Sequence, residues 1–179
     1  MSAIVRPYKG ILPRIHPSVF LANAVVVGDV EIGEESSLWY NVTVRGDVNS
    51  IRIGKRTNIQ DGSVVHCTHI TNPTVIGDEV LVGHLALLHG CTLEDRAFVG
   101  MKACVMDGAV VESEAMVAAG ALVTPGKRVR RGELWGGSPA KFLRPMNDAD
   151  LAMIDRMSGW YAGLAKEHMA AAAADLAAQ

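Results

Sequence analysis

Aliphatic residues recur at every sixth position through most of the chain. From Leu93 the sequence divides into "LEDRAF", "VGMKAC", "VMDGAV", "VESEAM", "VAAGAL" and "VTPGKR", and the first five of these have alanine at the fifth place. A period of six matches neither the 3.6-residue period of a helix nor the two-residue period of a strand. It is typical of a parallel β-helix, in which a hexapeptide makes one short strand and a corner, and three hexapeptides make one triangular coil.

The alternative is a β-sandwich of short strands. A sandwich would show alternating hydrophobic and polar residues with turn signals every 8–12 residues. The register here stays at six over most of about a hundred residues, in frames such as "IGKRTN" and "IQDGSV" upstream of Leu93. The pattern therefore predicts an all-β solenoid, a β-helix of hexapeptide repeats, as the fold class.

The repeat ends before the C-terminus. We expect the β-helix over residues 11–129 and a connecting segment over 130–146, where "VRRGELWGGSPAKFLRP" contains glycine and proline. From Asn147 or Asp148 onward the chain is rich in Ala, Leu and Met, with acidic residues early, which predicts an N-cap and a helix. This helix, over 147–179, is expected to pack back on the β-helix.

The six-residue register slips at four places. "VGDVE" and "LHGCT" are five residues long, "VRGDVNSIR" is nine and "VHCTHITNPTV" is eleven. Three of these four stretches carry the polar residues considered below. Because an irregular loop inside a strict repeat is more often functional than accidental, the slips direct attention to those residues.

Counting the sides of the triangle places two histidines in one column. Val65 and Leu88 hold the first place on the third side of successive coils, so His66 and His89 both hold the second place there. Arg45 takes the same place one coil earlier. Stacked strands lie about 4.8 Å apart, so the two imidazoles are expected to lie one above the other.

His84 belongs to another face. It holds the third place on the second side, above Asp61, so one chain presents a pair of histidines on one face and a single histidine on another. Three subunits around a three-fold axis would bring each pair against a neighbour's single histidine, giving three equivalent shared sites. Three neutral imidazoles with an open position suit Zn²⁺, and Fe²⁺ or Co²⁺ would also fit.

Charge and cysteine usage exclude several classes of partner. The formal net charge is −2, which offers no electrostatic basis for binding nucleic acid. The N-terminal residues lack the apolar core of a signal peptide, and no apolar run approaches membrane-spanning length. The three cysteines form no CxxC pair, which suits a reducing cytoplasm. The sequence thus predicts a cytoplasmic protein with neither nucleic acid nor membrane as a partner.

Further polar residues lie near the histidines. Arg45 and Asp47 in "VRGD" suggest an ion pair between subunits, for which a structural role is as reasonable as a catalytic one. Asn58, Gln60 and Asp61 in "NIQDG" lie beside the histidines, although polar residues on an exposed β-helix face need no special role. His69, three residues after His66, is a candidate proton carrier, with a solvated loop histidine as the alternative.

The motifs "VRGD", "NIQDGSVVH", "VGH" and "LHGC", followed by "GSPAK", resemble those of the γ-class carbonic anhydrases and their bacterial relatives. The resemblance covers roughly residues 10–165. It implies a left-handed β-helix and a homotrimer with metal at each subunit interface. It also implies that His66 and His89 of one chain and His84 of the next bind that metal.

The same resemblance assigns roles to other residues. It implies an intersubunit Arg45–Asp47 pair, and it places Gln60 and Asp61 near the metal-bound water. Asn58 would be a further polar contact of the pocket. Tyr161 matches a tyrosine common in the C-terminal helix of the family.

One departure concerns proton transfer. Well-characterised active members have a long acidic loop after the first histidine, with a glutamate that shuttles protons, whereas the loop here is "CTHITNPT" and has no acidic residue. His69 is the nearest ionisable group. We therefore predict reversible hydration of CO₂ to bicarbonate by a zinc-bound hydroxide at trimer interfaces, with low turnover. The alternatives are an acyl-CoA thioesterase that uses the same hydroxide and a catalytically silent trimeric metal-binding scaffold.

Overall fold

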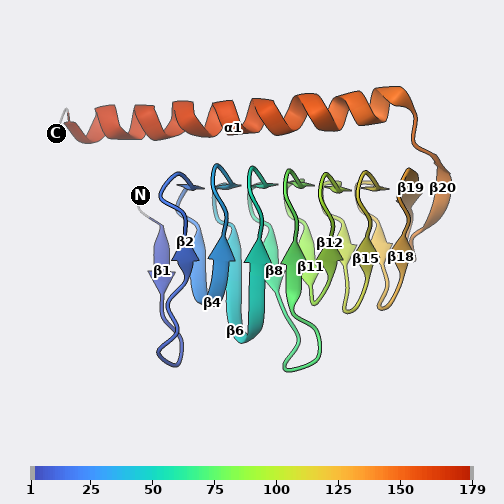
Figure 1. Cartoon of the computed structure of the whole chain (residues 1–179), viewed down its shortest axis with the longest axis horizontal. Helices are drawn as coiled ribbons and strands as arrows, with labels where there is room; N and C mark the ends of the chain where they lie inside the picture. Colours follow the sequence, from blue (N-terminus) through green and yellow to red (C-terminus); the bar gives the residue numbers. More distant parts are fainter. Residues whose placement is uncertain (1–2, 178–179) are drawn as a thin grey trace.

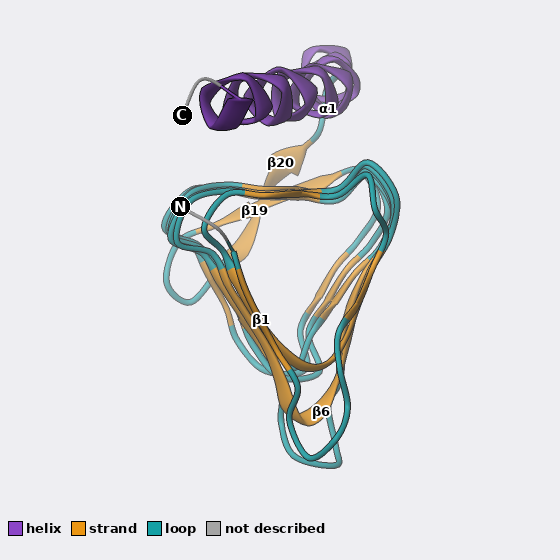
Figure 2. Ribbon diagram, turned by 90° about the vertical axis from the view of Figure 1, so that its left-hand side faces the viewer, coloured by secondary structure: helices purple, strands orange, loops and turns teal. Residues whose placement is uncertain are grey.

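The chain winds into a triangular parallel β-helix with one long helix beside it (Figure 1). The computed structural model describes residues 3–177. Viewed along the solenoid axis, the coils superpose as a triangle and the helix lies over one side (Figure 2). The β-helix predicted from the six-residue period is therefore confirmed.

The side that faces the helix is an eight-stranded sheet, called side two. In chain order its strands are β3 (Phe20–Leu21), β5 (Ser37–Leu38), β7 (Asn58–Ile59), β10 (Leu81–Val82), β13 (Phe98–Val99), β16 (Met116–Val117), β19 (Glu133–Gly136) and β20 (Lys141–Pro145). All neighbours pair in parallel except β19 and β20, which are antiparallel.

The other two sides form one twelve-stranded sheet, because the long strands β4 (Val25–Ile32) and β6 (Thr43–Ile53) continue around the vertex between them. Side three also contains β1 (Ile4–Arg6), β8 (Val64–His66), β11 (Leu87–His89), β14 (Cys104–Val105) and β17 (Leu122–Val123). Side one contains β2 (Arg14–Ile15), β9 (Thr74–Ile76), β12 (Thr92–Leu93), β15 (Val110–Val111) and β18 (Arg128–Val129).

The aliphatic first place of each hexapeptide points into the triangle. Ile53, Ile76, Leu93, Val111 and Val129 are paired coil to coil and at most 4% exposed. Burying each such side chain stabilises the fold by about 1.5–3 kcal/mol. The fifth-place alanines are also buried, because a larger side chain has no room inside the corner.

The chain turns each corner at the fourth place. Arg56 and Glu79 adopt φ angles of 49° and 57° there, and Gly108 adopts 65°. This left-handed region favours glycine, which explains "VMDGAV" and "VAAGAL", but the tight coil imposes it on other residues too.

The β-helix extends beyond the predicted boundaries of 11 and 129. At the N-terminal end, β1 pairs with β4. At the C-terminal end, the segment 130–146 is not only a connection, because Leu134 and Trp135 in β19 continue the register of Met116 and Val117. The six-residue spacing continues to Trp135, but Trp135 takes the aliphatic first place and Glu133 takes the place of the small fifth residue, which is why the sequence pattern missed this strand.

The helix α1 (Asp148–Ala177) follows the predicted range closely. Asn147 is its N-cap, since its side-chain oxygen accepts a hydrogen bond from the Asp150 backbone N–H at 3.0 Å. The Arg144 guanidinium and the Asn147 backbone N–H lower the pKa of Asp150 to about 2. Residues 178 and 179 of the predicted helix lie outside the described residues. Within the described part of the chain, no helix has the length and apolar character needed to cross a membrane.

The three sides of the solenoid have different surfaces. Side two is covered by α1, which packs on β3, β5, β7 and β10. Side one carries ion pairs, such as that of Arg52 with Glu31 at 3.1 Å. Side three exposes a register-aligned column that alternates with the buried core residues and consists of Val64, Leu87, Cys104 and Leu122. The side that bears His66 and His89 therefore carries a partly exposed apolar column that no element of the described chain covers.

Candidate metal centre

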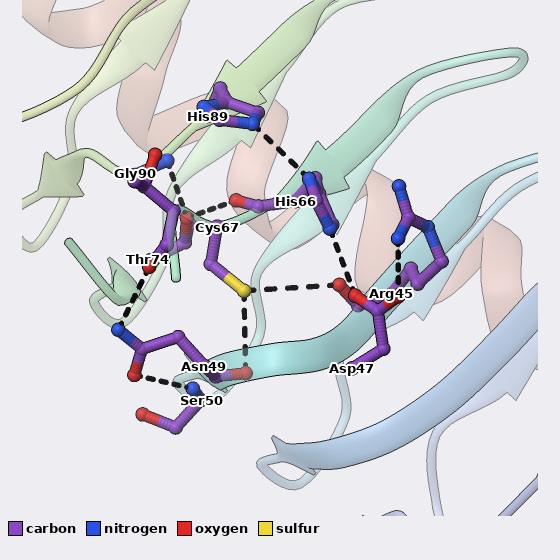
Figure 3. A network of polar contacts seen from close by, with 10 residues as sticks. Arg45, Asp47, Asn49, Ser50, His66, Cys67, Thr74, His89 and Gly90 are labelled. Carbon is purple, nitrogen blue, oxygen red and sulfur yellow. Dashed lines mark hydrogen bonds and ion pairs between the residues drawn. The ribbon is translucent and has the colours of Figure 1, made fainter. Parts of the chain in front are cut away.

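His66 and His89 form a stacked pair on side three, as the register predicts. Their Cα atoms are paired between β8 and β11. Nδ1 of His66 lies 3.1 Å from Nε2 of His89, and the ring centroids are 5.1 Å apart (Figure 3). Both side chains are only partly exposed, at 16% and 27%.

Each of the three candidate ligands has a carboxylate at one ring nitrogen. Nε2 of His66 lies 2.9 Å from Asp47, and Nδ1 of His89 lies 2.9 Å from Asp107. Nδ1 of His84 lies 2.9 Å from Asp61, which confirms the predicted stacking of these two residues.

A carboxylate at one ring nitrogen keeps the proton on that nitrogen and leaves the other nitrogen free to bind a metal. The free atoms are therefore Nδ1 of His66, Nε2 of His89 and Nε2 of His84. This is the arrangement that protein metal sites use to fix the tautomer of a histidine ligand.

The carboxylates beside the histidine pair are themselves anchored. Asp47 accepts a hydrogen bond from Arg45 at 2.5 Å. Burial opposes ionisation of Asp47, but the hydrogen bonds from His66 and Arg45 outweigh it and keep its pKa below the ordinary value. The resemblance places the Arg45–Asp47 pair between subunits. Within one chain the two side chains also meet, because they lie two residues apart on β6.

On the other flank, Asp107 accepts a hydrogen bond from the Thr68 hydroxyl at 2.6 Å. That bond, followed in size by the hydrogen bond from His89, lowers the pKa of Asp107 although burial opposes the change. A continuous line of contacts thus runs from Arg45 through the histidine pair to Thr68, on strands β6, β8 and β11 and the adjoining turns.

The free nitrogens of the pair fit a metal ion. Two nitrogens bound to one tetrahedral zinc at about 2.0–2.1 Å lie roughly 3.3 Å apart. The observed 3.1 Å needs only a small adjustment of either ring. Within residues 3–177 of one chain, no group of three or more His, Cys, Asp or Glu side chains is placed to hold a metal.

The second group of predicted residues meets on side two beneath α1. Gln60, His84 and Tyr161 line one cavity, and Tyr161 comes from the helix. Burial raises the pKa of the Tyr161 phenol and the nearby Asp61 carboxylate raises it further, while the contact with Gln60 partly offsets both. The phenol therefore stays protonated and can donate a hydrogen bond.

Two predicted residues lie apart from these groups. Asn58 is 1% exposed, and its amide donates to the Ser37 hydroxyl at 2.9 Å, but it does not line the cavity beside His84. His69 is exposed in the loop closed by the bridge between Thr68 and Asn72. Its role as a proton carrier stays a prediction.

The cysteines beside the histidines are packing residues. Cys67 and Cys91 are both 1% exposed in the core cluster. Burial raises the pKa of Cys67 and raises that of Cys91 to about 12. Since a metal binds the thiolate, neither thiol competes with the imidazoles as a ligand.

Asp107 and Thr68 were missed from the sequence. Asp107 belongs to "VMDGAV", a hexapeptide that keeps the six-residue spacing, so no irregularity of the repeat pointed to it. Thr68 lies within the irregular loop, where the sequence drew attention only to His69. The available signal was a carboxylate one coil after His89, displaced by one place from the histidine column.

Comparisons with known proteins give consistent relatives, although no family model matches the chain. The γ-carbonic anhydrase 1 of Arabidopsis thaliana mitochondria is 49% identical over 88% of this chain and 60% of the relative. A protein named carbonic anhydrase from Geobacillus kaustophilus is 41% identical over 88% of this chain and 87% of its own length. The protein YrdA of Escherichia coli is 42% identical over 85% of this chain and 86% of its own length. The chain spans about 60% of the length of the Arabidopsis relatives.

Solved structures agree on the fold. A hexapeptide transferase family protein from Anaplasma phagocytophilum is 46% identical with a TM-score of 0.89, covering 93% of this chain and 99% of that one. A structure described as a Bacillus cereus acetyltransferase is 36% identical with a TM-score of 0.91, covering 94% of this chain and 98% of that one. The predicted left-handed β-helix of hexapeptide repeats is confirmed.

Proposed function

This chain belongs to the γ-carbonic anhydrase family, and from that premise we propose that it is a metal-dependent enzyme that hydrates CO₂ reversibly to bicarbonate. Several relatives that are 41–51% identical over most of the chain are named γ-carbonic anhydrase or carbonic anhydrase. The observation that carries the proposal is the histidine pair with nitrogens 3.1 Å apart, in which the opposite nitrogen of each ring meets a carboxylate.

We propose further that the protein is a homotrimer. His66 and His89 lie on side three, whereas His84 lies on side two, so one chain presents an incomplete ligand set. The uncovered apolar column on side three supports burial of this face against a neighbour. The partner subunit's His84 would then complete each site.

Zinc is the metal we propose, because three neutral imidazoles with one open position are its common catalytic ligand set. Zinc bound there would supply a hydroxide nucleophile near neutral pH. Asp47, Asp61 and Asp107 hold the three imidazoles in the tautomers that leave a nitrogen free. Gln60 would orient the water that the metal activates through its side-chain amide, and Asp61 would accept a hydrogen bond or proton from that water.

Proton export is the step for which this chain is least equipped. The loop around His69 has no acidic residue, and His69 is exposed to solvent. A solvent-exposed imidazole can exchange protons directly with buffer molecules. Turnover is therefore expected to depend strongly on buffer concentration.

The test is stopped-flow CO₂ hydration with protein of verified metal content, beside a panel of acyl-CoA thioesters. Wild-type protein should hydrate CO₂, and His66→Ala should lose both metal and hydration. A matched control is His16→Ala, an exposed histidine near the N-terminus. Full hydration by metal-free His66→Ala protein, or thioester hydrolysis without CO₂ hydration, would contradict the proposal.

A further inference from the structure

A cavity of about 470 Å³ lies between side two and α1. Leu81, Phe98 and Met116 of the solenoid line one wall, and Met153 and Met157 of the helix line the other. It extends along the solenoid from Gln60, next to β7, to Leu134 in β19. Because stacked strands lie about 4.8 Å apart, the strands that bound it are separated by roughly 19 Å, and the cavity is a channel along the coil axis.

The channel exists because one column of side two has small residues. Gly83, Gly100 and Ala118 each follow a buried valine and face the helix. A Cβ atom at Gly83 would lie 2.7 Å from the Met101 nitrogen, and one at Gly100 would lie 2.4 Å from the Ala119 nitrogen. The close stacking of coils therefore requires glycine there, and no side chain fills the space above.

The other half of the same interface is filled. Two coils earlier than Gly83, the column contains Trp39, which packs edge-on against Phe20 with ring centroids 5.1 Å apart. Trp39 and Phe20 also form one buried cluster with Ala165 of α1. The aromatic half of the interface therefore holds the helix in place, and the methionine half is hollow.

The polar groups of the channel gather at its ends. Gln60, Tyr161 and the proposed metal ligand His84 lie at one end. At the other end the Asp150 carboxylate is paired with Arg144 at 2.6 Å. The walls between the two ends are apolar, and methionine side chains are flexible enough to adapt to an occupant.

We propose that this channel binds an unbranched aliphatic chain with an uncharged polar head group. The elongated apolar walls suit the chain. The Tyr161 hydroxyl can donate a hydrogen bond to the head group, and the Gln60 amide can donate or accept one. An anionic head beside His84 would lie close to the Asp61 carboxylate, which contacts His84 at 2.9 Å. A cationic head would lose its hydration without gaining a free carboxylate, because Asp61 is already paired with His84 and Asp150 with Arg144. Binding at this site requires no metal, so the proposal is independent of the carbonic anhydrase activity.

The probe is a series of straight-chain alcohols from 1-butanol to 1-decanol, with binding to the full-length protein measured by calorimetry. Affinity should rise about fourfold for each added methylene until the channel is full, and then level off. Octanoate and octylamine should bind more weakly than 1-octanol. The measurements are made on chelator-treated wild type and on His66→Ala, so an inactive or metal-free enzyme does not affect the result.

Two substitutions test the position of the site. Ala118→Leu fills the floor of the channel, and Ala119→Leu narrows it at an exposed position. Each should weaken binding of 1-octanol by about fifteenfold, the equivalent of losing roughly two buried methylenes. Ala152→Leu, the same change at an exposed position on α1, should leave binding unchanged.

Three results would overturn the proposal. The first is an affinity that does not depend on chain length. The second is unchanged binding of 1-octanol in folded Ala119→Leu protein. The third is tighter binding of octanoate or octylamine than of 1-octanol, which would show a charged head group at the site.

Discussion

Substituting Asp107 measures how much the carboxylate beside a histidine contributes to metal binding at this site. Asp107 accepts one hydrogen bond from His89 and one from Thr68, at 2.9 and 2.6 Å. Asp107→Asn keeps the size of the side chain and removes its charge. The His89 N–H then donates to a neutral acceptor, and the tautomer that leaves Nε2 free for the metal is less strongly favoured.

The magnitude follows from the change in bond type. A hydrogen bond to a charged group contributes about 1.5–3 kcal/mol and a neutral one about 0.5–1.5 kcal/mol, so the substitution costs about 1–1.5 kcal/mol. That corresponds to roughly tenfold weaker zinc binding, at the lower end of the range usual for groups that orient metal ligands. Because His89 is 27% exposed, water replaces part of the lost interaction and keeps the loss of zinc affinity near the lower end of that range.

The assay is competition for zinc against a fluorescent chelator, with the melting temperature of the metal-free protein as a check on folding. Thr68→Val should weaken zinc binding by a smaller factor, because it loosens Asp107 without removing its charge. The double variant should be less than additive, since both changes act on the same bond. Asp148→Asn, at an exposed position in the first turn of α1, is the matched control. Zinc affinity equal to wild type in folded Asp107→Asn protein would refute the reasoning.

The other predictions concern assembly, proton transfer and pH. The protein should scatter light as a trimer near three times 19.1 kDa. Trimers that mix His84→Ala chains with His66→Ala/His89→Ala chains should regain zinc binding that neither homotrimer has, and lack of rescue in verified mixtures would exclude sites shared between subunits. His69→Ala should lower CO₂ hydration in weak buffer, and added imidazole should restore it; an unchanged rate at every buffer strength would assign His69 to the solvated loop. The pKa of Asp150 is depressed from 3.8 to about 2, so its contribution to stability is present above pH 4 and is lost as pH falls towards 2. Asp150→Asn should therefore lower the melting temperature at pH 7, with a difference from wild type that shrinks over this acid range; a constant difference would count against the Arg144 pair.

The sequence alone determined the repeat, and with it the neighbours of most side chains. In a solenoid each strand pairs with the strand one coil away, so counting in sixes predicts contacts that are distant in sequence. The His66–His89 column and the position of His84 above Asp61 both follow from this count. Buried aliphatic residues at each first place leave little freedom to shift the register, because a one-residue slip would expose them.

Only the tertiary structure decided the contacts that leave the repeat. Asp107 contacts both His89 and Thr68, and Thr68 lies in the irregular loop closed by the Thr68–Asn72 bridge, which no periodicity describes. Tyr161 reaches Gln60 and Asp61 because the packing of Trp39 and Ile154 sets the lateral position of α1. The hexapeptide register specifies stacking along the axis, whereas the placement of a helix against the outside of the solenoid depends on side-chain shapes from several coils at once.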